Sequence, residues 1–251
     1  MNTHPIWSKL GTKSPLFRST GGLLFGIFLA NMTAEYSFPD IILATDIQGQ
    51  VFYRGPVPES TTIPITKDSE VCGTSRKNTP IRVHTSGGLQ HVIISIQGHP
   101  DTDSDQTQDY VLTNKGCEFY PAVGTVSINQ KIHVSNKDAI LHNTHIRTTD
   151  RAFLNVVLLP DSKGITKPFK KPGPMTIQCN KHPFMAGAIY VFAHPFHTTT
   201  DEQGLFRISG LTPGVYTLRS FHPVLGTQEQ KVTIPSDGLA SVTVEFSAPP
   251  P

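Results

Sequence analysis

Short apolar or alternating segments recur along the chain, and this repetition limits the fold more than any other feature of the sequence. The segments are Gly49–Tyr53, Ile81–His84, His91–Ile96, Thr125–Ile128, Lys131–Val134, Asn155–Leu159, Met175–Cys179 and Gly187–Phe192. Gly, Pro, Asn and Asp separate them, and none shows a 3.6-residue apolar repeat of helical length. Short strands with turn residues between them predict an all-β sandwich or barrel.

A second set of segments with strand character follows residue 193. Turns such as Gly210–Gly214 separate its members, and Ala240–Phe246 is the last of them. A unit of about 55 residues is marginal for independent folding. We therefore expect residues 194–248 to pack on a larger domain of residues 46–193, or to share the strand Ala188–Phe192 with it.

Residues 1–34 have the character of an export signal. Basic residues precede Gly21–Ala30, an uncharged and mostly apolar run that is too short to span a bilayer as a helix. Ala34 fits the position before a cleavage site, but Met32 is larger than the residue usually found there. Export to the periplasm is the expectation, and an uncleaved anchor remains the alternative.

Charge excludes a nucleic-acid partner. The chain has 21 Lys and Arg against 19 Asp and Glu, and loss of Lys9, Lys13 and Arg18 with the signal leaves 18 against 19. Nucleic acid is bound by clustered basic residues, which a nearly neutral chain does not indicate. Membrane contact is expected only if the N-terminal segment is uncleaved.

Three different metal-binding side chains lie close together in Cys179-Asn-Lys-His182-Pro-Phe-Met185. A further imidazole comes from His142, in the segment His142-Asn-Thr-His145. Two imidazoles, a thiolate and a weak axial thioether form the donor set of mononuclear copper sites that transfer single electrons. The predicted metal ligands are therefore His142, Cys179, His182 and Met185.

Other histidines are weaker candidates. His145 follows His142 by three positions, so on a regular strand the two side chains face opposite sides. Only one of them can then face the metal, and His145 is the alternative to His142 as first ligand. His194, His197 and His222 gather near the expected domain junction. A second metal site there is less expected than ordinary packing.

The cysteine count is odd, which points to one thiol with a separate role. If Cys179 binds a metal, Cys72 and Cys117 are left to pair, as an oxidising compartment allows. Such a bridge would stabilise the fold by about 4 kcal/mol. Two free buried thiols remain the alternative.

The two ligand segments resemble those of the cupredoxin (type 1 blue copper) family, in particular its amicyanin/plastocyanin-like members, over residues 132–193. The resemblance implies a Greek-key β-sandwich with one type 1 copper ion held by the four predicted ligands. It also implies that Asn143 ties the two ligand-bearing strands together. The role it implies is that of a periplasmic electron carrier that docks transiently with protein redox partners.

The rest of the chain resembles longer cupredoxin-like proteins of the methylamine-utilisation type. The matching segments are Cys72-Gly73, Gly87-Gly88-Leu89 and Cys117-Glu-Phe119. The end of the chain, with Thr200-Asp-x-x-Gly-x-Phe206, resembles a carboxypeptidase regulatory-like β module, which is non-catalytic. The resemblance therefore implies a cupredoxin sandwich followed by a small antiparallel β module.

An enzyme is not expected. The sequence has no Gly-rich phosphate loop, Gly-x-Ser-x-Gly elbow or His-Glu-x-x-His motif. Two alternatives to electron transfer stay open. One is a copper-binding or storage protein without a redox partner, and the other is an adhesion or carbohydrate-binding module with a structural metal site.

Overall fold

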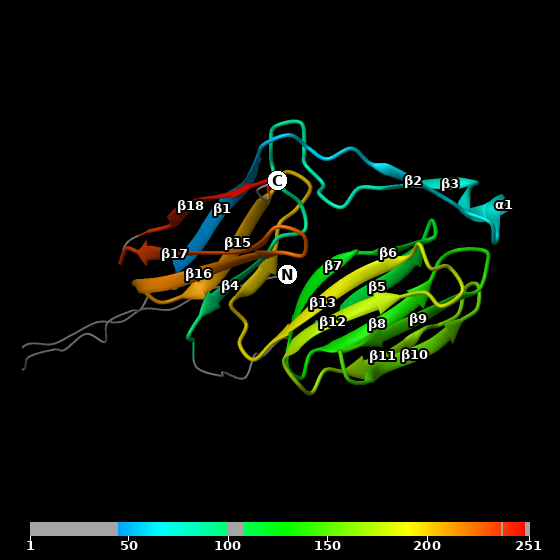
Figure 1. Ribbon diagram of the computed structural model, residues 1–251. Helices are drawn as coiled ribbons and strands as arrows, with labels where there is room; N and C mark the ends of the chain where they lie inside the picture. The colour runs from blue at the N-terminus through cyan, green and yellow to red at the C-terminus, as the bar shows by residue number, and fades with distance from the viewer. Residues whose placement is uncertain (1–44, 100–107, 237, 249–251) are drawn as a thin grey trace, which may run out of the picture. The chain divides into compact units, whose positions relative to one another are not determined.

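Two separate hydrophobic cores organise the part of the chain that the structure describes, and each is built by a pair of β-sheets. The computed structural model describes residues 45–99, 108–236 and 238–248 (Figure 1). The export signal expected at residues 1–34 lies outside these residues. The chain divides into residues 1–40 and 41–251, and only the second unit contains described residues.

The first sandwich is formed by the middle of the chain. Its strands are β5 (Tyr110–Lys115), β6 (Glu118–Tyr120), β7 (Val123–Ser127), β8 (Lys131–Asn136), β9 (His142–Arg147), β10 (Ala152–Leu158), β11 (Ile165–Pro168), β12 (Gly173–Gln178) and β13 (Ala186–Phe192). One sheet has the order β10-β9-β12-β13-β7 and the other the order β11-β8-β5-β6. Alternate residues of β12, Met175 and Ile177, enter the core, and Cys179 continues that face.

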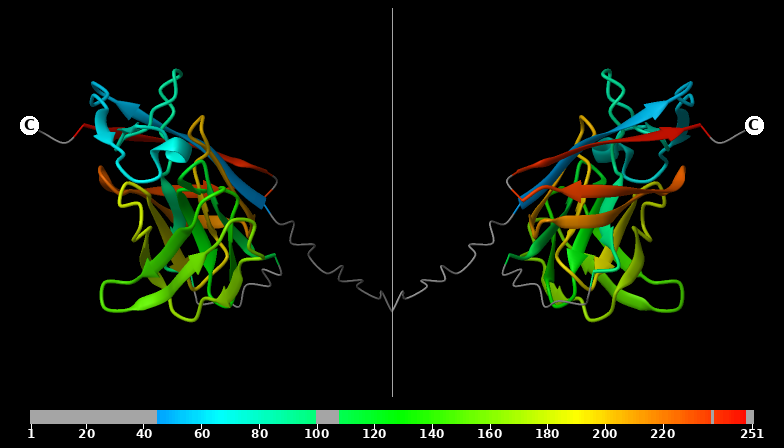
Figure 2. Two further views of the ribbon diagram at one scale, coloured as in Figure 1. Left: turned by 90° about the vertical axis from the view of Figure 1, so that its right-hand side faces the viewer. Right: turned by 90° about the vertical axis from the view of Figure 1, so that its left-hand side faces the viewer.

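The second sandwich joins strands from both ends of the described chain. Its strands are β1 (Thr45–Arg54), β4 (Ile93–Gln97), β14 (His197–Thr199), β15 (Leu205–Leu211), β16 (Gly214–His222), β17 (Gly226–Ile234) and β18 (Ala240–Ser247). The sheets have the orders β15-β1-β18 and β14-β4-β16-β17. Strand β1 runs parallel to β18 and lies beside it (Figure 2).

These sheets cross the boundary that was expected at residue 193. Strands β1 and β4 take interior positions among the strands of residues 194–248. The strand Ala186–Phe192 stays in the first sandwich and is not shared. The physical reason is the small size of the C-terminal segment, which cannot bury enough apolar surface alone. Ile47, Val51, Ile94 and Ile96, each at most 1% exposed, complete its core.

A third, smaller element lies between β1 and β4 in the sequence. It contains the paired strands β2 (Thr61–Pro64) and β3 (Ser75–Asn78), with the short helix α1 (Ser69–Cys72) between them. We call residues 61–78 the arm. A disulfide joins Cys72 of the arm to Cys117, between β5 and β6, with the two Cα atoms 5.5 Å apart.

The prediction of an all-β fold is confirmed, since α1 is the one helix among the described residues. At four residues α1 is far too short to cross a membrane, and the described chain has no other helix that could.

Candidate metal centre

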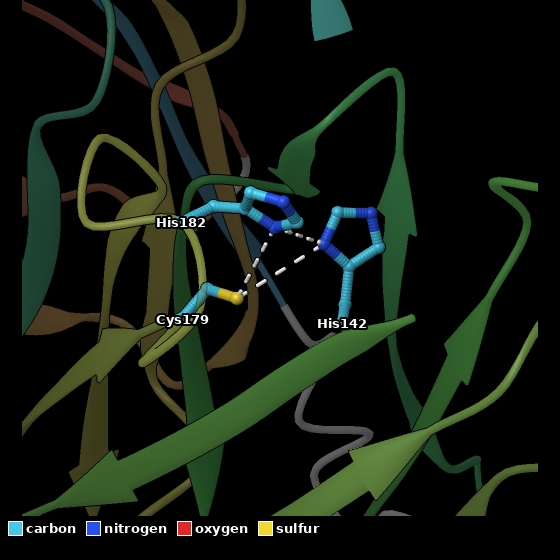
Figure 3. Close-up of side chains that lie close together, drawn as sticks. All are labelled: His142, Cys179 and His182. Carbon is cyan, nitrogen blue, oxygen red and sulfur yellow. Dashed lines mark hydrogen bonds between the residues drawn. The ribbon is translucent and has the colours of Figure 1, made fainter. Parts of the chain in front are cut away.

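Three potential metal ligands converge between β9 and the loop that follows β12. Cys179 Sγ lies 3.6 Å from His182 Nδ1 and 4.0 Å from His142 Nδ1, and the two nitrogens are 3.0 Å apart. The side chains point toward one another (Figure 3). A thiolate with two imidazoles is the planar part of the donor set that suits copper.

Strand pairing explains why distant residues meet. His142 is the first residue of β9, and Cys179 directly follows β12, which is the hydrogen-bonded neighbour of β9. After Cys179 the chain makes a tight loop closed by two backbone hydrogen bonds, from Met185 N to His182 O (2.9 Å) and from Cys179 N to Met185 O (3.3 Å). This loop turns His182 back toward the sulfur.

The separations suit a single ion. A metal about 2.0 Å from each nitrogen and about 2.3 Å from sulfur, with its ligands about 120° apart, holds the donor atoms about 3.5–3.7 Å from one another. The observed 3.0, 3.6 and 4.0 Å lie on both sides of those values. Little movement is therefore needed to place one ion among the three atoms.

The centre is buried. His142 and His182 are 0% exposed, and Cys179 and Met185 are 1% exposed. Burial lowers the pKa of His142, although the neighbouring Asp138 carboxylate acts in the opposite direction. The neutral imidazole that burial favours is the form that binds metals. Met185 lies at the end of the ligand loop, and its role as axial ligand stays a prediction.

A carboxylate lies behind each imidazole. Asp138 Oδ2 is 2.8 Å from His142 Nε2, and Asp68 Oδ2 is 2.7 Å from His182 Nε2. A carboxylate accepts from an N–H, so each Nε2 carries a proton, and in the neutral imidazole Nδ1 then keeps its lone pair. Two lone pairs and a sulfur then face one another in a buried pocket, an arrangement that a cation relieves. The donor set therefore fits a metal ion.

Asn143 connects the elements around the sulfur. Its backbone N–H donates to Cys179 Sγ (3.4 Å), and its Oδ1 accepts from the backbone N–H of Asn180 (3.4 Å). Its Nδ2 donates to Asn155 Oδ1 and to Val156 O on β10. Asn143 thus holds β9, β10 and the start of the ligand loop in one network.

The other histidines lie apart from this cluster. His145 pairs with Asn155 and Gln178 in its sheet and is not one of the converging donors. Within residues 45–99, 108–236 and 238–248, no group of three close donors includes His194, His197 or His222. A second group consists of Cys117, Asp138 and His142, but the Cys117 sulfur is already in the disulfide.

Two site residues were missed from the sequence. Asp138 precedes His142 by four positions, in the turn before β9, and that spacing was a usable signal. Asp68 lies 114 positions before His182, and no local pattern predicts their contact. The neighbouring Lys181 ammonium, together with His182, holds the pKa of Asp68 below its usual range. Asp68 is therefore an anion beside the centre.

Comparisons with solved structures give matches over part of the chain. No family model and no curated protein matches. The copper-containing nitrite reductase of Thermus scotoductus SA-01 is 20% identical, with a TM-score of 0.32, over 38% of this chain and 24% of its own length. Amicyanin from Paracoccus versutus is 19% identical, with a TM-score of 0.31, over 39% of this chain and 97% of its own. The purple cupredoxin from Nitrosopumilus maritimus is 17% identical, with a TM-score of 0.30, over 34% of this chain and 100% of its own.

The chain thus spans about a quarter of the nitrite reductase, and each of these matches leaves most of this chain uncovered. The resemblance of residues 194–248 to a regulatory-like module stays a prediction.

Proposed function

We propose that this chain is an exported type 1 copper protein that carries single electrons between protein redox partners. One observation supports this most strongly: His142 Nδ1, Cys179 Sγ and His182 Nδ1 converge within 4.0 Å in a buried pocket. We assign Met185, in the same loop, as the axial ligand. Copper bound there supplies one-electron exchange between its two common oxidation states.

The surrounding residues hold the donor atoms in one arrangement. The ligand-bearing strands β9 and β12 are directly paired, with Ile177 opposite Ile146. The N–H of Asn143 donates to the Cys179 sulfur, and this contact stabilises negative charge on the thiolate. Because each imidazole is also held from behind, the ligands need little rearrangement when the charge of the centre changes. Small rearrangement is what rapid electron transfer requires.

Location and partners are part of the proposal. The Cys72–Cys117 disulfide is the kind of bond that persists in an oxidising compartment such as the periplasm. The carrier we propose passes its electron by transient docking with protein partners and is not itself an enzyme.

The test is copper loading followed by visible absorption and voltammetry. We expect one equivalent of Cu(II) to give an intense band from thiolate-to-copper charge transfer, together with a reversible voltammetric wave. Cys179→Ser should abolish the band. Tight Cu(I) binding with no band and no wave would instead indicate the storage alternative. Failure to bind copper, with retention of another metal, would indicate a structural site.

A further inference from the structure

The arm reaches the metal centre although it belongs to neither sandwich. Besides the disulfide, Arg76 on β3 donates to the backbone carbonyls of Gly116 and Cys117 and forms a 3.2 Å ion pair with Glu118. Its guanidinium also lies 5.6 Å from the ring centroid of Phe184, in the ligand loop. One covalent bond and several polar contacts therefore hold the arm on the end of the first sandwich that carries the centre.

Asp68 is placed unusually within the arm. It is the N-cap residue of α1, and its backbone carbonyl accepts from Val71 N (3.0 Å) and Cys72 N (2.9 Å). An N-cap aspartate normally turns its carboxylate onto its own helix. Here the carboxylate makes no capping bond and instead contacts His182 Nε2 and Lys181 Nζ, both at 2.7 Å. Its φ of 53° is a left-handed conformation that few non-glycine residues adopt.

We propose that Asp68 is a positioning residue for His182, and that the Cys72–Cys117 disulfide keeps it in place. This inference rests on the proposed copper function. Accepting from Nε2–H fixes the tautomer and ring orientation, so that the Nδ1 lone pair faces the sulfur. The negative charge also favours the more highly charged state of a bound ion and so lowers its reduction potential.

The disulfide joins the segments that carry both carboxylates. Cys117 N–H donates to Asp138 Oδ2 (2.8 Å), and Gly116 N–H donates to Asp138 Oδ1 (2.6 Å). Asp138 in turn holds His142. Asp138 lies within the first sandwich and keeps these contacts without the bridge, whereas Asp68 reaches the centre only through the arm. Loss of the bridge leaves the arm held only by non-covalent contacts such as those of Arg76, so it should loosen the hold on His182 and leave His142 held.

The experiment compares Asp68→Ala and Asp68→Asn with Glu70→Gln in the full chain. Glu70 is an exposed acidic residue of the same helix, which makes it a matched control for charge. We expect Asp68→Ala to weaken Cu(I) binding about 10- to 100-fold, measured by competition with a chromophoric chelator, and to raise the midpoint potential. Asp68→Asn keeps an acceptor oxygen, so it should recover most of the affinity but not the potential. Glu70→Gln should leave both unchanged.

A metal-free readout separates this inference from the copper proposal. Two-bond ¹H–¹⁵N spectra of the metal-free protein should show His182 as the Nε2–H tautomer, and Asp68→Ala should change that signal. If the protein formed no copper–thiolate band but this tautomer result held, the copper proposal would fail and the positioning contact would stand. An unchanged His182 signal, or unchanged affinity and potential in Asp68→Ala, would overturn the inference.

The role of the disulfide is tested by a double-mutant cycle. The variant lacking both Cys72 and Cys117 should weaken copper binding, by no more than Asp68→Ala does. Adding Asp68→Ala to that variant should weaken binding less than it does in the bridged protein, because both changes act on the same contact. Fully additive losses would show that the bridge acts independently of Asp68. Should the bridgeless variant not fold, mild reduction of the disulfide in the copper-loaded protein provides the same comparison.

Discussion

Asp138 accepts three hydrogen bonds, and the loss of each has a different cost. Its Oδ2 accepts from His142 Nε2–H and from Cys117 N–H, both at 2.8 Å, and its Oδ1 accepts from Gly116 N–H at 2.6 Å. The His142 ring is 0% exposed, so its N–H has no access to water once the carboxylate is gone. A buried donor without an acceptor costs about 1–3 kcal/mol. Gly116 is exposed, so its N–H can turn to water instead.

We therefore expect Asp138→Ala to lower the free energy of unfolding of the metal-free protein by about 2–6 kcal/mol, the sum of about 1–3 kcal/mol for each of the buried His142 and Cys117 N–H groups. Asp138→Asn can keep its oxygen on those two donors, so only the Gly116 contact is lost and the cost should be about 1 kcal/mol. Urea unfolding curves measure both values. The matched control is Asp46→Ala, which breaks the ion pair with the exposed Arg207 and should destabilise the protein much less than Asp138→Ala does.

Equal stability of Asp138→Ala and the wild-type protein would refute the reasoning, because it would mean that His142 Nε2 does not depend on this carboxylate. A destabilisation by Asp138→Asn as large as that by Asp138→Ala would refute the assignment of the acceptor atoms. A small loss of stability in Asp46→Ala would show that a large loss in Asp138→Ala is specific to this carboxylate and is not a general effect of removing an aspartate.

Three further predictions concern the axial ligand, acid stability and the disulfide. Met185→Leu should raise the reduction potential and leave most of the visible band, because the axial ligand is weak; loss of copper binding would contradict the assigned geometry. Burial lowers the pKa of His197 to about 3 and that of His222 to about 4, from the usual 6.5. As the pH falls below 6.5, the unfolded chain takes up these protons before the folded chain does. The free energy of unfolding should therefore fall with acidification, by about 4 kcal/mol for the two histidines together at pH 5. Urea unfolding at pH 7.5 and 5.0 measures this fall, and a stability that does not change with pH would contradict it. Reduction of the Cys72–Cys117 bond, at a sequence separation of 45, should lower the free energy of unfolding by about 4 kcal/mol. The control is a variant without the bridge, whose thermal midpoint the reductant should leave unchanged. An unchanged midpoint in the bridged protein as well would contradict the prediction.

Local patterns were sufficient for the all-β fold and for the loop that carries the donors. The alternation in β12 places Met175, Ile177 and Cys179 on one face, and this can be read directly from the sequence. Cys179, His182 and Met185 are also close in the chain, so a tight turn brings their segment together without information from elsewhere. His142 required one further step, the pairing of β9 with β12.

Long-range pairings could not be predicted in the same way. Strand β1 pairs with β15 and β18, which lie more than 150 positions later in the chain. The alternation of residues along β1 predicts a half-buried strand but does not identify these partners. The contact of Asp68 with His182 depends on the position of the arm, which both the disulfide and Arg76 join to the segment around Cys117. Such contacts result from how whole sheets and a cross-link are arranged, and no spacing along the chain encodes them.

The most direct test of the proposed centre is X-ray absorption at the copper K edge of the copper-loaded protein. The account predicts one sulfur and two imidazole nitrogens within about 2.0–2.3 Å of the metal, and loss of the sulfur in Cys179→Ser. A copper environment of nitrogen and oxygen alone, unchanged by that substitution, would contradict it.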